Sequence, residues 1–223
     1  MPTIDYLGHA CFLVTGQEHT LLFDPYLTDN PQAAISAAEV KPDYILVSHG
    51  HFDHLGDAFA IARRTGATII TTLDLAKECE KQQLPTHAMN IGCKHNFAFG
   101  YVRTTQALHH AGLVGGEACG FIVNLDGYTL YFTGDTSLFG DLKLYGIIEH
   151  PDLLLLPIGG YYTMDIDDAV YAAKLVNAKT IIPFHYNTWP LIEADPAVFA
   201  AKVAKHTSSH CVILAPGESC DLS

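Results

Sequence analysis

The chain reads Tyr44-Ile45-Leu46-Val47-Ser48-His49-Gly50-His51-Phe52-Asp53-His54 at the end of an apolar, strand-like run. A helical spacing of apolar residues follows from Leu55. A strand end that turns into a helix start lets closely spaced side chains converge from one loop. Imidazole and carboxylate groups are the ligands that zinc and similar divalent ions prefer. The spacing His-x-His-x-Asp-His therefore predicts a metal site rather than a solvated polar loop.

The composition is that of a folded, acidic protein. Hydrophobic residues make up 49% and charged residues only 16% of the 223, which is enough to bury a substantial core. With a net charge of −12, the chain lacks the excess of basic residues that binding to nucleic acid or anionic membranes requires. We therefore expect a small-molecule substrate as partner, no nucleic acid and no membrane, with a homo-oligomer left open.

The cysteines and the N-terminus indicate the compartment. The six cysteines form no Cys-x-x-Cys pair and no disulfide-scaffold spacing, so they are expected to be reduced thiols. The first residues carry neither a basic region nor the apolar core of a signal peptide. A cytoplasmic location follows as an expectation.

Strand-like and helix-like runs alternate in a repeated order. The expected strands are Ile4–Leu7, Cys11–Thr15, Thr20–Phe23, Tyr44–Ser48, Thr68–Thr72, Phe97–Phe99, Tyr101–Leu108, Cys119–Leu125, Tyr128–Phe132, Asp152–Ile158, Thr180–Phe184 and Cys211–Ala215. The expected helices are Pro31–Val40, a helix from Leu55, Leu73–Leu84, Asp165–Asn177 and Pro196–His206. Each half has strands first and strand–helix units afterwards. This order predicts an α/β protein of two packed sheets with helices outside, in one domain spanning residues 1–223.

Three later strand-like runs also end in metal ligands. Tyr101–Leu108 leads to His109 and His110, Tyr128–Phe132 leads to Asp135, and Thr180–Phe184 leads to His185. Ligands at strand ends along one sheet edge are where α/β folds build sites. Six or seven nitrogen and oxygen ligands exceed what one tetrahedral zinc needs. We therefore expect two metals that share a bridging carboxylate.

The order of these motifs resembles the metallo-β-lactamase superfamily over essentially the whole chain. The resemblance implies an αββα four-layer sandwich of two mixed β-sheets flanked by helices. It implies two divalent ions, most simply zinc, with manganese or nickel as alternatives. Its ligand pattern assigns His49, His51 and His109 to one metal, Asp53, His54 and His185 to the second, and Asp135 to the bridge.

The adjacent pair His109 and His110 leaves one assignment open, because a strand directs only one of two neighbours inward. We favour His109, which directly follows the apolar Ala107-Leu108 as in relatives with an aromatic-or-Leu-His pair.

Shorter runs indicate a branch of the superfamily. Residues 6–10 and 23–26 resemble the Leu-Gly-His-Ala and Asp-Pro segments of the branch that includes L-ascorbate-6-phosphate lactonase. Residues 184–188 and 215–218 resemble small bacterial metal-dependent hydrolases whose substrates are largely unassigned.

Four further residues are expected near the metals. His9 contacts substrate or supports a ligand, or alternatively is a buried structural histidine. Asp24 orients a ligand or a loop, since metal-bound histidines usually donate their other N–H to a carboxylate or carbonyl. His110 and Asn187 are expected beside the ligands or the substrate. In addition, the later run with Tyr161, Tyr162 and Met164 either lines the pocket or forms a packed loop, which is the default.

The expected function is a metal-dependent hydrolase in which a hydroxide bridging two metals cleaves an ester, lactone or phosphodiester of a small metabolite. Asp53 is expected to act in catalysis by binding metal and hydrogen-bonding the nucleophile. Two alternatives stay open: a mononuclear-iron oxidoreductase of the persulfide dioxygenase type, and a metal-binding protein without turnover.

Overall fold

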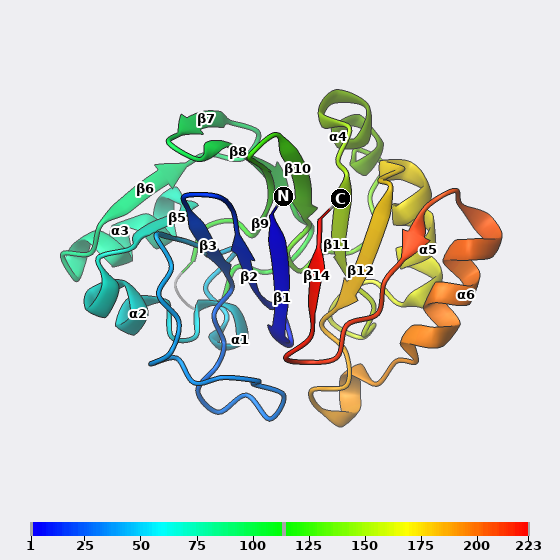
Figure 1. Ribbon diagram of the computed structural model, residues 1–223, viewed down its shortest axis with the longest axis horizontal. Helices are drawn as coiled ribbons and strands as arrows, with labels where there is room; N and C mark the ends of the chain where they lie inside the picture. Colours follow the sequence, from blue (N-terminus) through cyan, green and yellow to red (C-terminus); the bar gives the residue numbers. More distant parts are fainter. Residues whose placement is uncertain (1, 113–114, 223) are drawn as a thin grey trace.

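The computed structural model describes residues 2–112 and 115–222 and contains two seven-stranded sheets (Figure 1). The first sheet contains, in spatial order, β14 (Ser219–Asp221), β1 (Thr3–Gly8), β2 (Cys11–Thr15), β3 (Thr20–Phe23), β4 (Tyr44–Leu46), β5 (Thr68–Thr72) and β6 (Thr86–Met89). The second contains β13 (His210–Cys211), β12 (Thr180–Phe184), β11 (Leu153–Pro157), β10 (Tyr128–Phe132), β9 (Cys119–Leu125), β8 (Gly100–Gln106) and β7 (Lys94–Phe97). Both sheets are mixed, with antiparallel pairs at one side and parallel pairs at the other.

Helices cover the outer face of each sheet. The first sheet is covered by α2 (Ala58–Thr65) and α3 (Leu73–Lys81), and the second by α4 (Leu142–Glu149), α5 (Ile166–Val176) and α6 (Pro196–His206). Two short elements, α1 (Phe52–Leu55) and the 3₁₀ turn η1 (Pro190–Ile192), lie in loops beside the sheets. The four layers confirm the predicted αββα sandwich.

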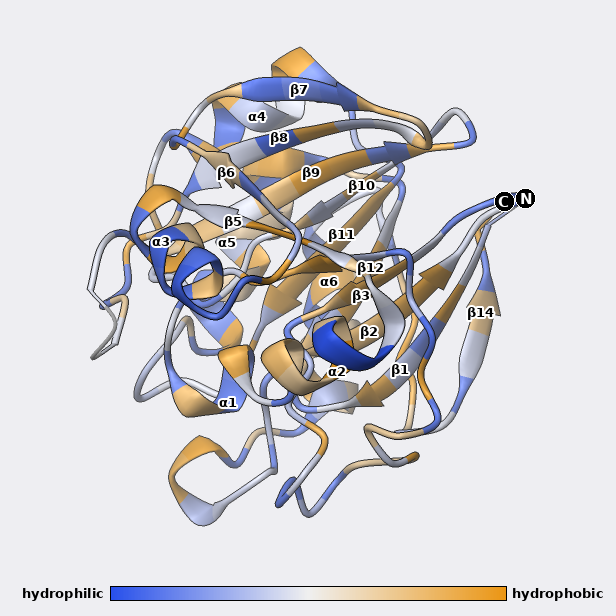
Figure 2. Cartoon of the chain, turned by 90° about the vertical axis from the view of Figure 1, so that its left-hand side faces the viewer, coloured by the Kyte–Doolittle hydropathy of each residue, from blue (hydrophilic) through white to orange (hydrophobic). Residues whose placement is uncertain are grey.

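The core between the sheets is largely aromatic. Phe12 of the first sheet meets Phe132 and Phe184 of the second, with ring centroids 6.3 and 5.9 Å apart. Central strand β11 is buried along its whole length because the first sheet covers one of its faces and helices cover the other. Hydrophobic residues accordingly gather on the central strands, while edge strand β7 is mostly hydrophilic (Figure 2).

The predicted helix at Pro31–Val40 is wrong, since these residues form turns and bends. Ala33, Ile35, Ala37 and Val40 pack against the core. The N–H groups of Ala33 and Glu39 donate to carbonyls three residues before them, which closes separate turns rather than one helix. The Ala34 N–H also donates to the carbonyl of Leu7 and so ties the segment to β1. Helix α4 and strands β6 and β14 have no counterpart among the expected elements.

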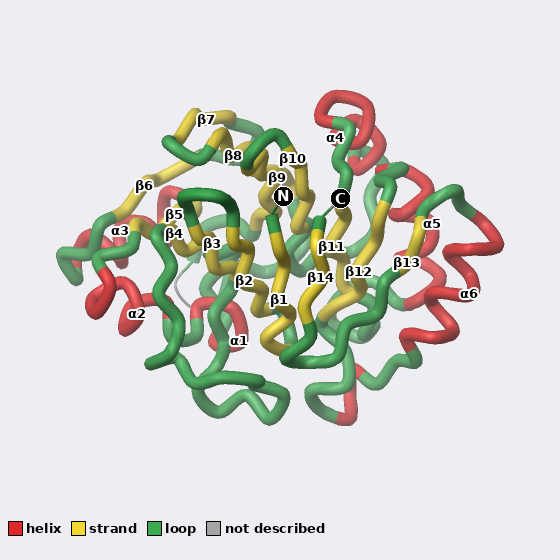
Figure 3. The backbone as a smooth tube through the Cα atoms, in the orientation of Figure 1, coloured by secondary structure: helices red, strands yellow, loops and turns green. Residues whose placement is uncertain are grey.

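Strand direction brings the predicted ligands to one place. Pairing puts the C-terminal ends of β1, β3 and β4 at one edge of the first sheet, and those of β8, β10 and β12 at one edge of the second. The two edges adjoin, because the His185 N–H donates to the His9 carbonyl at 2.9 Å. Long loops leave the sheets on this side (Figure 3). Within the described residues, no helix has the length and apolarity needed to cross a membrane.

Candidate metal centre

The segment after β4 presents its ligands through a sharp change of structure. The strand ends at Leu46, and α1 begins at Phe52, directly after His51. Asp53 and His54 therefore lie in the first turn of a helix, whereas His49 and His51 lie in the loop before it. This change explains how one short run can direct four side chains toward a single point.

Three histidines form the first group of ligand atoms. His49 Nε2 lies 2.9 Å from His51 Nδ1, which lies 3.3 Å from His109 Nε2. Two nitrogens bound at about 2.05 Å to one tetrahedral zinc are roughly 3.3 Å apart. The three nitrogens are thus spaced as the corners of a coordination polyhedron, with His109 arriving from the loop after β8.

The second group combines two imidazoles with two carboxylates. Asp135 Oδ2 lies 3.2 Å from His54 Nε2 and 3.1 Å from His185 Nε2. Asp53 Oδ2 lies 3.7 and 3.6 Å from the same two nitrogens. Asp135 Oδ2 is also 3.6 Å from His109 Nε2 of the first group, so this carboxylate stands between the two groups.

Several of these buried atoms lack a hydrogen-bond partner. They include His54 Nε2, His185 Nε2 and Asp135 Oδ1. Buried polar atoms are nearly always paired, and an unpaired one is costly. Two nitrogens and a carboxylate oxygen left unpaired at the second group therefore fit a metal ion as their missing partner, and the donor set of both groups suits borderline divalent ions.

Asp24 binds the Nδ1 side of the His54 ring, opposite to the nitrogen that faces the second group. Its Oδ2 accepts from His54 Nδ1 at 2.6 Å and from the Ser48 hydroxyl at 2.6 Å, while Oδ1 accepts from the Ser48 N–H at 2.7 Å. The Nδ1 proton fixes the tautomer of His54 and leaves Nε2 free to face the centre. The fully buried Asp24 is thus placed to orient His54, and together with His49 and His54 it forms a third possible ligand group.

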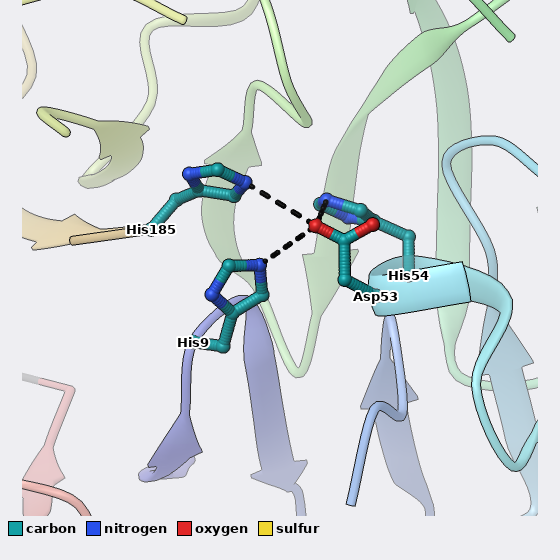
Figure 4. A group of neighbouring side chains, drawn as sticks. All are labelled: His9, Asp53, His54 and His185. Carbon is teal, nitrogen blue, oxygen red and sulfur yellow. Dashed lines mark hydrogen bonds and ion pairs between the residues drawn. The ribbon is translucent and has the colours of Figure 1, made fainter. Parts of the chain in front are cut away.

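His9 reaches the second group from the turn between β1 and β2 (Figure 4). Its Nε2 lies 3.1 Å from Asp53 Oδ2, and its Nδ1 lies 2.7 Å from the Thr188 hydroxyl. Gly8 permits this turn, since a Cβ there would lie 2.6 Å from the Gln32 carbonyl oxygen. His9 is fully buried and contacts Asp53, and its role in turnover stays a prediction.

Burial lowers the pKa of these imidazoles, and the neighbouring carboxylates raise it. Burial disfavours the charged form of His185, but Asp135 and Asp53 outweigh it and raise its pKa to about 9. Burial dominates at His49 and lowers its pKa well below the usual range. The carboxylates of the second group thus favour positive charge beside them.

Comparison with known proteins decides the family. The model of the Beta-lactamase superfamily domain matches residues 3–185. The chain belongs to the metallo-β-lactamase superfamily. A UPF0173 metal-dependent hydrolase from Pelotomaculum thermopropionicum is 47% identical and covers 98% of this chain and 99% of its own. A UPF0173 metal-dependent hydrolase from Carboxydothermus hydrogenoformans is 48% identical and covers 96% of this chain and 97% of its own.

A solved structure of this superfamily has nearly the same fold. Igni18, described as a novel metallo hydrolase from Ignicoccus hospitalis, superposes with a TM-score of 0.93 at 34% identity, covering 98% of this chain and 97% of its own. The family resemblance seen in the motifs is therefore confirmed along nearly the whole length.

Two residues predicted beside the centre belong to neither ligand group. His110 is exposed and its Nδ1 accepts from the Gly112 N–H, while its ring stacks on that of His51 with centroids 5.9 Å apart, so it lies beside a predicted ligand. Asn187 is also exposed, and its side-chain oxygen accepts from the Ala194 N–H, which closes the turn around η1. Asn187 is not among the residues that line the pocket over the centre, and its contact with substrate stays a prediction.

The geometry predicts different results for the two adjacent histidines. His109→Ala should lose one of the bound metals, since it removes one of three converging nitrogens, while His110→Ala should keep full metal content. Elemental analysis of both variants after identical metal loading measures this. Metal loss confined to His110→Ala would reverse the assignment.

A pocket of about 400 Å³ opens over the centre. Its floor is formed by five predicted ligands, and its walls by Phe52, Tyr162, Trp189 and Leu191. Tyr162 therefore lines the pocket, against the default of a packed loop. Sequence reasoning missed the other three wall residues. The available signals were the position of Phe52 inside the ligand motif and of Trp189, the single tryptophan, four residues after His185.

Proposed function

We propose that the chain is a two-metal hydrolase that cleaves an ester, lactone or phosphodiester bond of a small metabolite. The observation that carries this proposal is the position of Asp135, whose Oδ2 lies within 3.6 Å of ligand nitrogens from both groups. A carboxylate shared by two ligand sets is the arrangement expected for a dinuclear centre. Full-length similarity to proteins named metal-dependent hydrolases supports the same class.

Residues around the centre are placed to take part in this hydrolysis. Bound ions would supply an acidified water as nucleophile and polarise the oxygen of the scissile group. Asp53 faces the pocket, and its Oδ2 also takes the contact from His9, so it is placed to accept the proton of the attacking water. His9 and Thr188 hold that carboxylate in place from the buried side.

Zinc is our proposed metal, with manganese and nickel as substitutes, because the donors are imidazole and carboxylate. We further propose a cytoplasmic enzyme that needs no nucleic acid or membrane partner. All six cysteines are free, and none stands within the two ligand groups, which supports a reducing compartment and nitrogen–oxygen coordination.

Two metal ions per chain are the expected result of careful reconstitution. Protein stripped with a chelator and titrated with zinc should saturate at two equivalents, measured by elemental analysis and calorimetry. Activity on a panel of esters, lactones and phosphodiesters should return with the metals.

Saturation at one equivalent would contradict the dinuclear centre. Iron in the purified protein, together with sulfur-dependent oxygen uptake, would favour the persulfide dioxygenase alternative. Two bound metals without turnover on any of these bond classes would favour a binding protein.

A further inference from the structure

The walls of the pocket are apolar, although its floor consists of ligands. Phe52 is 69% exposed, Leu191 53% and Tyr162 46%, and Trp189 is half-buried among them. Soluble proteins rarely leave several large apolar side chains exposed together, and such groups mark binding sites. These four residues are here called the apolar wall, and a molecule that binds them must itself present an apolar surface.

The apolar wall is continuous with the centre. The Trp189 ring lies 4.9 Å from the His9 ring and 6.2 Å from the Phe52 ring, measured between centroids. Phe52 stands in the chain between the ligands His51 and Asp53. A molecule whose reacting group lies over the metal ligands therefore rests the remainder of its atoms on this wall.

The pocket offers no cation from the protein. All twelve Lys and Arg residues fall within the described part of the chain, and none of them lines the pocket. Several are engaged elsewhere: Lys94 and Arg103 with Glu149, and Lys179 with Asp152. Bound metal ions would meet the charge of the reacting group only, and an anionic group elsewhere in the substrate normally needs Arg or Lys. The lining instead matches an uncharged molecule.

We infer that the substrate is an uncharged carboxylic ester or lactone with an apolar or aromatic group of small size, held by the apolar wall. This inference rests on the proposed hydrolase function and narrows its bond class. Water adds its oxygen to the acyl carbon as the acyl carbon–oxygen bond breaks, and the alcohol oxygen takes a proton. The products are a carboxylate and an alcohol, which a lactone keeps in one molecule.

Three substrates with the same leaving group test the inference on zinc-loaded protein. They are para-nitrophenyl hexanoate, the mono-para-nitrophenyl ester of adipic acid, and bis(para-nitrophenyl) phosphate. The first two share chain length and scissile bond and differ by one terminal carboxylate. We expect kcat/KM for the hexanoate to exceed both others about 10-fold or more.

Leu191→Arg adds a cation to the apolar wall and has a matched control. The variant should lower kcat/KM for the hexanoate about 10-fold. The ratio of kcat/KM for the adipate ester to kcat/KM for the hexanoate should rise by ~10–100-fold. Leu144→Arg changes a leucine of nearly equal exposure, 52%, on α4 and outside the pocket, and should leave that ratio unchanged.

Trp189 provides a second readout that needs no turnover. Because it is the only tryptophan, its fluorescence reports directly on the wall. Titration of the loaded protein with hexananilide, an amide that resists hydrolysis, should change the emission saturably, and the Leu191→Arg variant should bind it about 10-fold more weakly.

The outcomes separate the two proposals. Equal or faster cleavage of the charged ester or the phosphodiester overturns the substrate class and leaves the hydrolase intact. Fluorescence binding of hexananilide without turnover of any ester or diester overturns the hydrolase. A Trp189 emission that responds to protein concentration but not to hexananilide assigns the wall to contact between copies of the chain and overturns the inference.

Discussion

Asp135→Ala is expected to abolish hydrolysis, with kcat/KM falling by ~1,000-fold or more. The wild-type carboxylate is 2% exposed and has ligand nitrogens of His54, His185 and His109 around one of its oxygens. Removing it leaves these imidazoles without the anion that joins the two groups. Several kcal/mol of electrostatic stabilisation are lost with a bridging ligand, which corresponds to a loss of this size.

The measurement combines kinetics with metal content. Asp135→Ala should hold fewer than two metals after loading that saturates the wild type. Asp135→Asn keeps the shape of the side chain but has one oxygen instead of two, so it should also lose activity while folding normally by circular dichroism. Normal turnover of Asp135→Ala at full metal occupancy would show that Asp135 is not the bridge.

Asp24→Ala is expected to weaken the second metal and to destabilise the fold. The substitution removes the acceptor of three buried hydrogen bonds, two from Ser48 and one from His54 Nδ1. Donors left buried and unpaired cost about 1–3 kcal/mol each, and outer partners of metal-bound histidines typically contribute 10–100-fold to metal affinity or activity. We expect a lower free energy of unfolding and a 10–100-fold weaker metal affinity.

Asp57→Ala is the matched control for this variant. Asp57 also accepts three hydrogen bonds in the neighbouring loop, from the Leu27 N–H and from the N–H and hydroxyl of Thr28, yet it contacts no predicted ligand. It should lower the unfolding free energy in denaturant titrations but leave zinc affinity close to wild type. Equal loss of zinc affinity in both variants would mean that Asp24 acts through loop stability alone.

The ligand set could be predicted because its chemistry is local. His-x-His-x-Asp-His follows an apolar run, and the later candidates, such as Asp135 and His185, each follow a strand-like run. In a mixed sheet, runs of the same direction end at the same edge, so ligands at strand ends must meet. The two-sheet sandwich follows from the same repeated order of strands and helices.

Other features depended on contacts between distant segments. His9, Asp24 and His185 all have positive φ angles, of 58°, 37° and 55°, which ordinary residues adopt only when surrounding structure imposes them. The sequence from Pro31 to Val40 predicts a helix, but the Ala34 N–H bond to Leu7 of β1 and the packing of this segment against the core hold it in turns and bends. In this segment, tertiary packing overrides the local helix propensity.

By itself, the sequence determined which side chains converge on the candidate metal centre, because residue type and strand order are properties of the chain. Only the tertiary structure decided what surrounds that centre. Asn187 turns toward the Ala194 N–H, whereas Phe52 of α1, Tyr162, and the pair Trp189 and Leu191 at η1 come from three separate segments to form one apolar wall. The direction of a loop side chain is set by the hydrogen bonds and neighbours that folding brings to it, and those come from residues far away in the sequence.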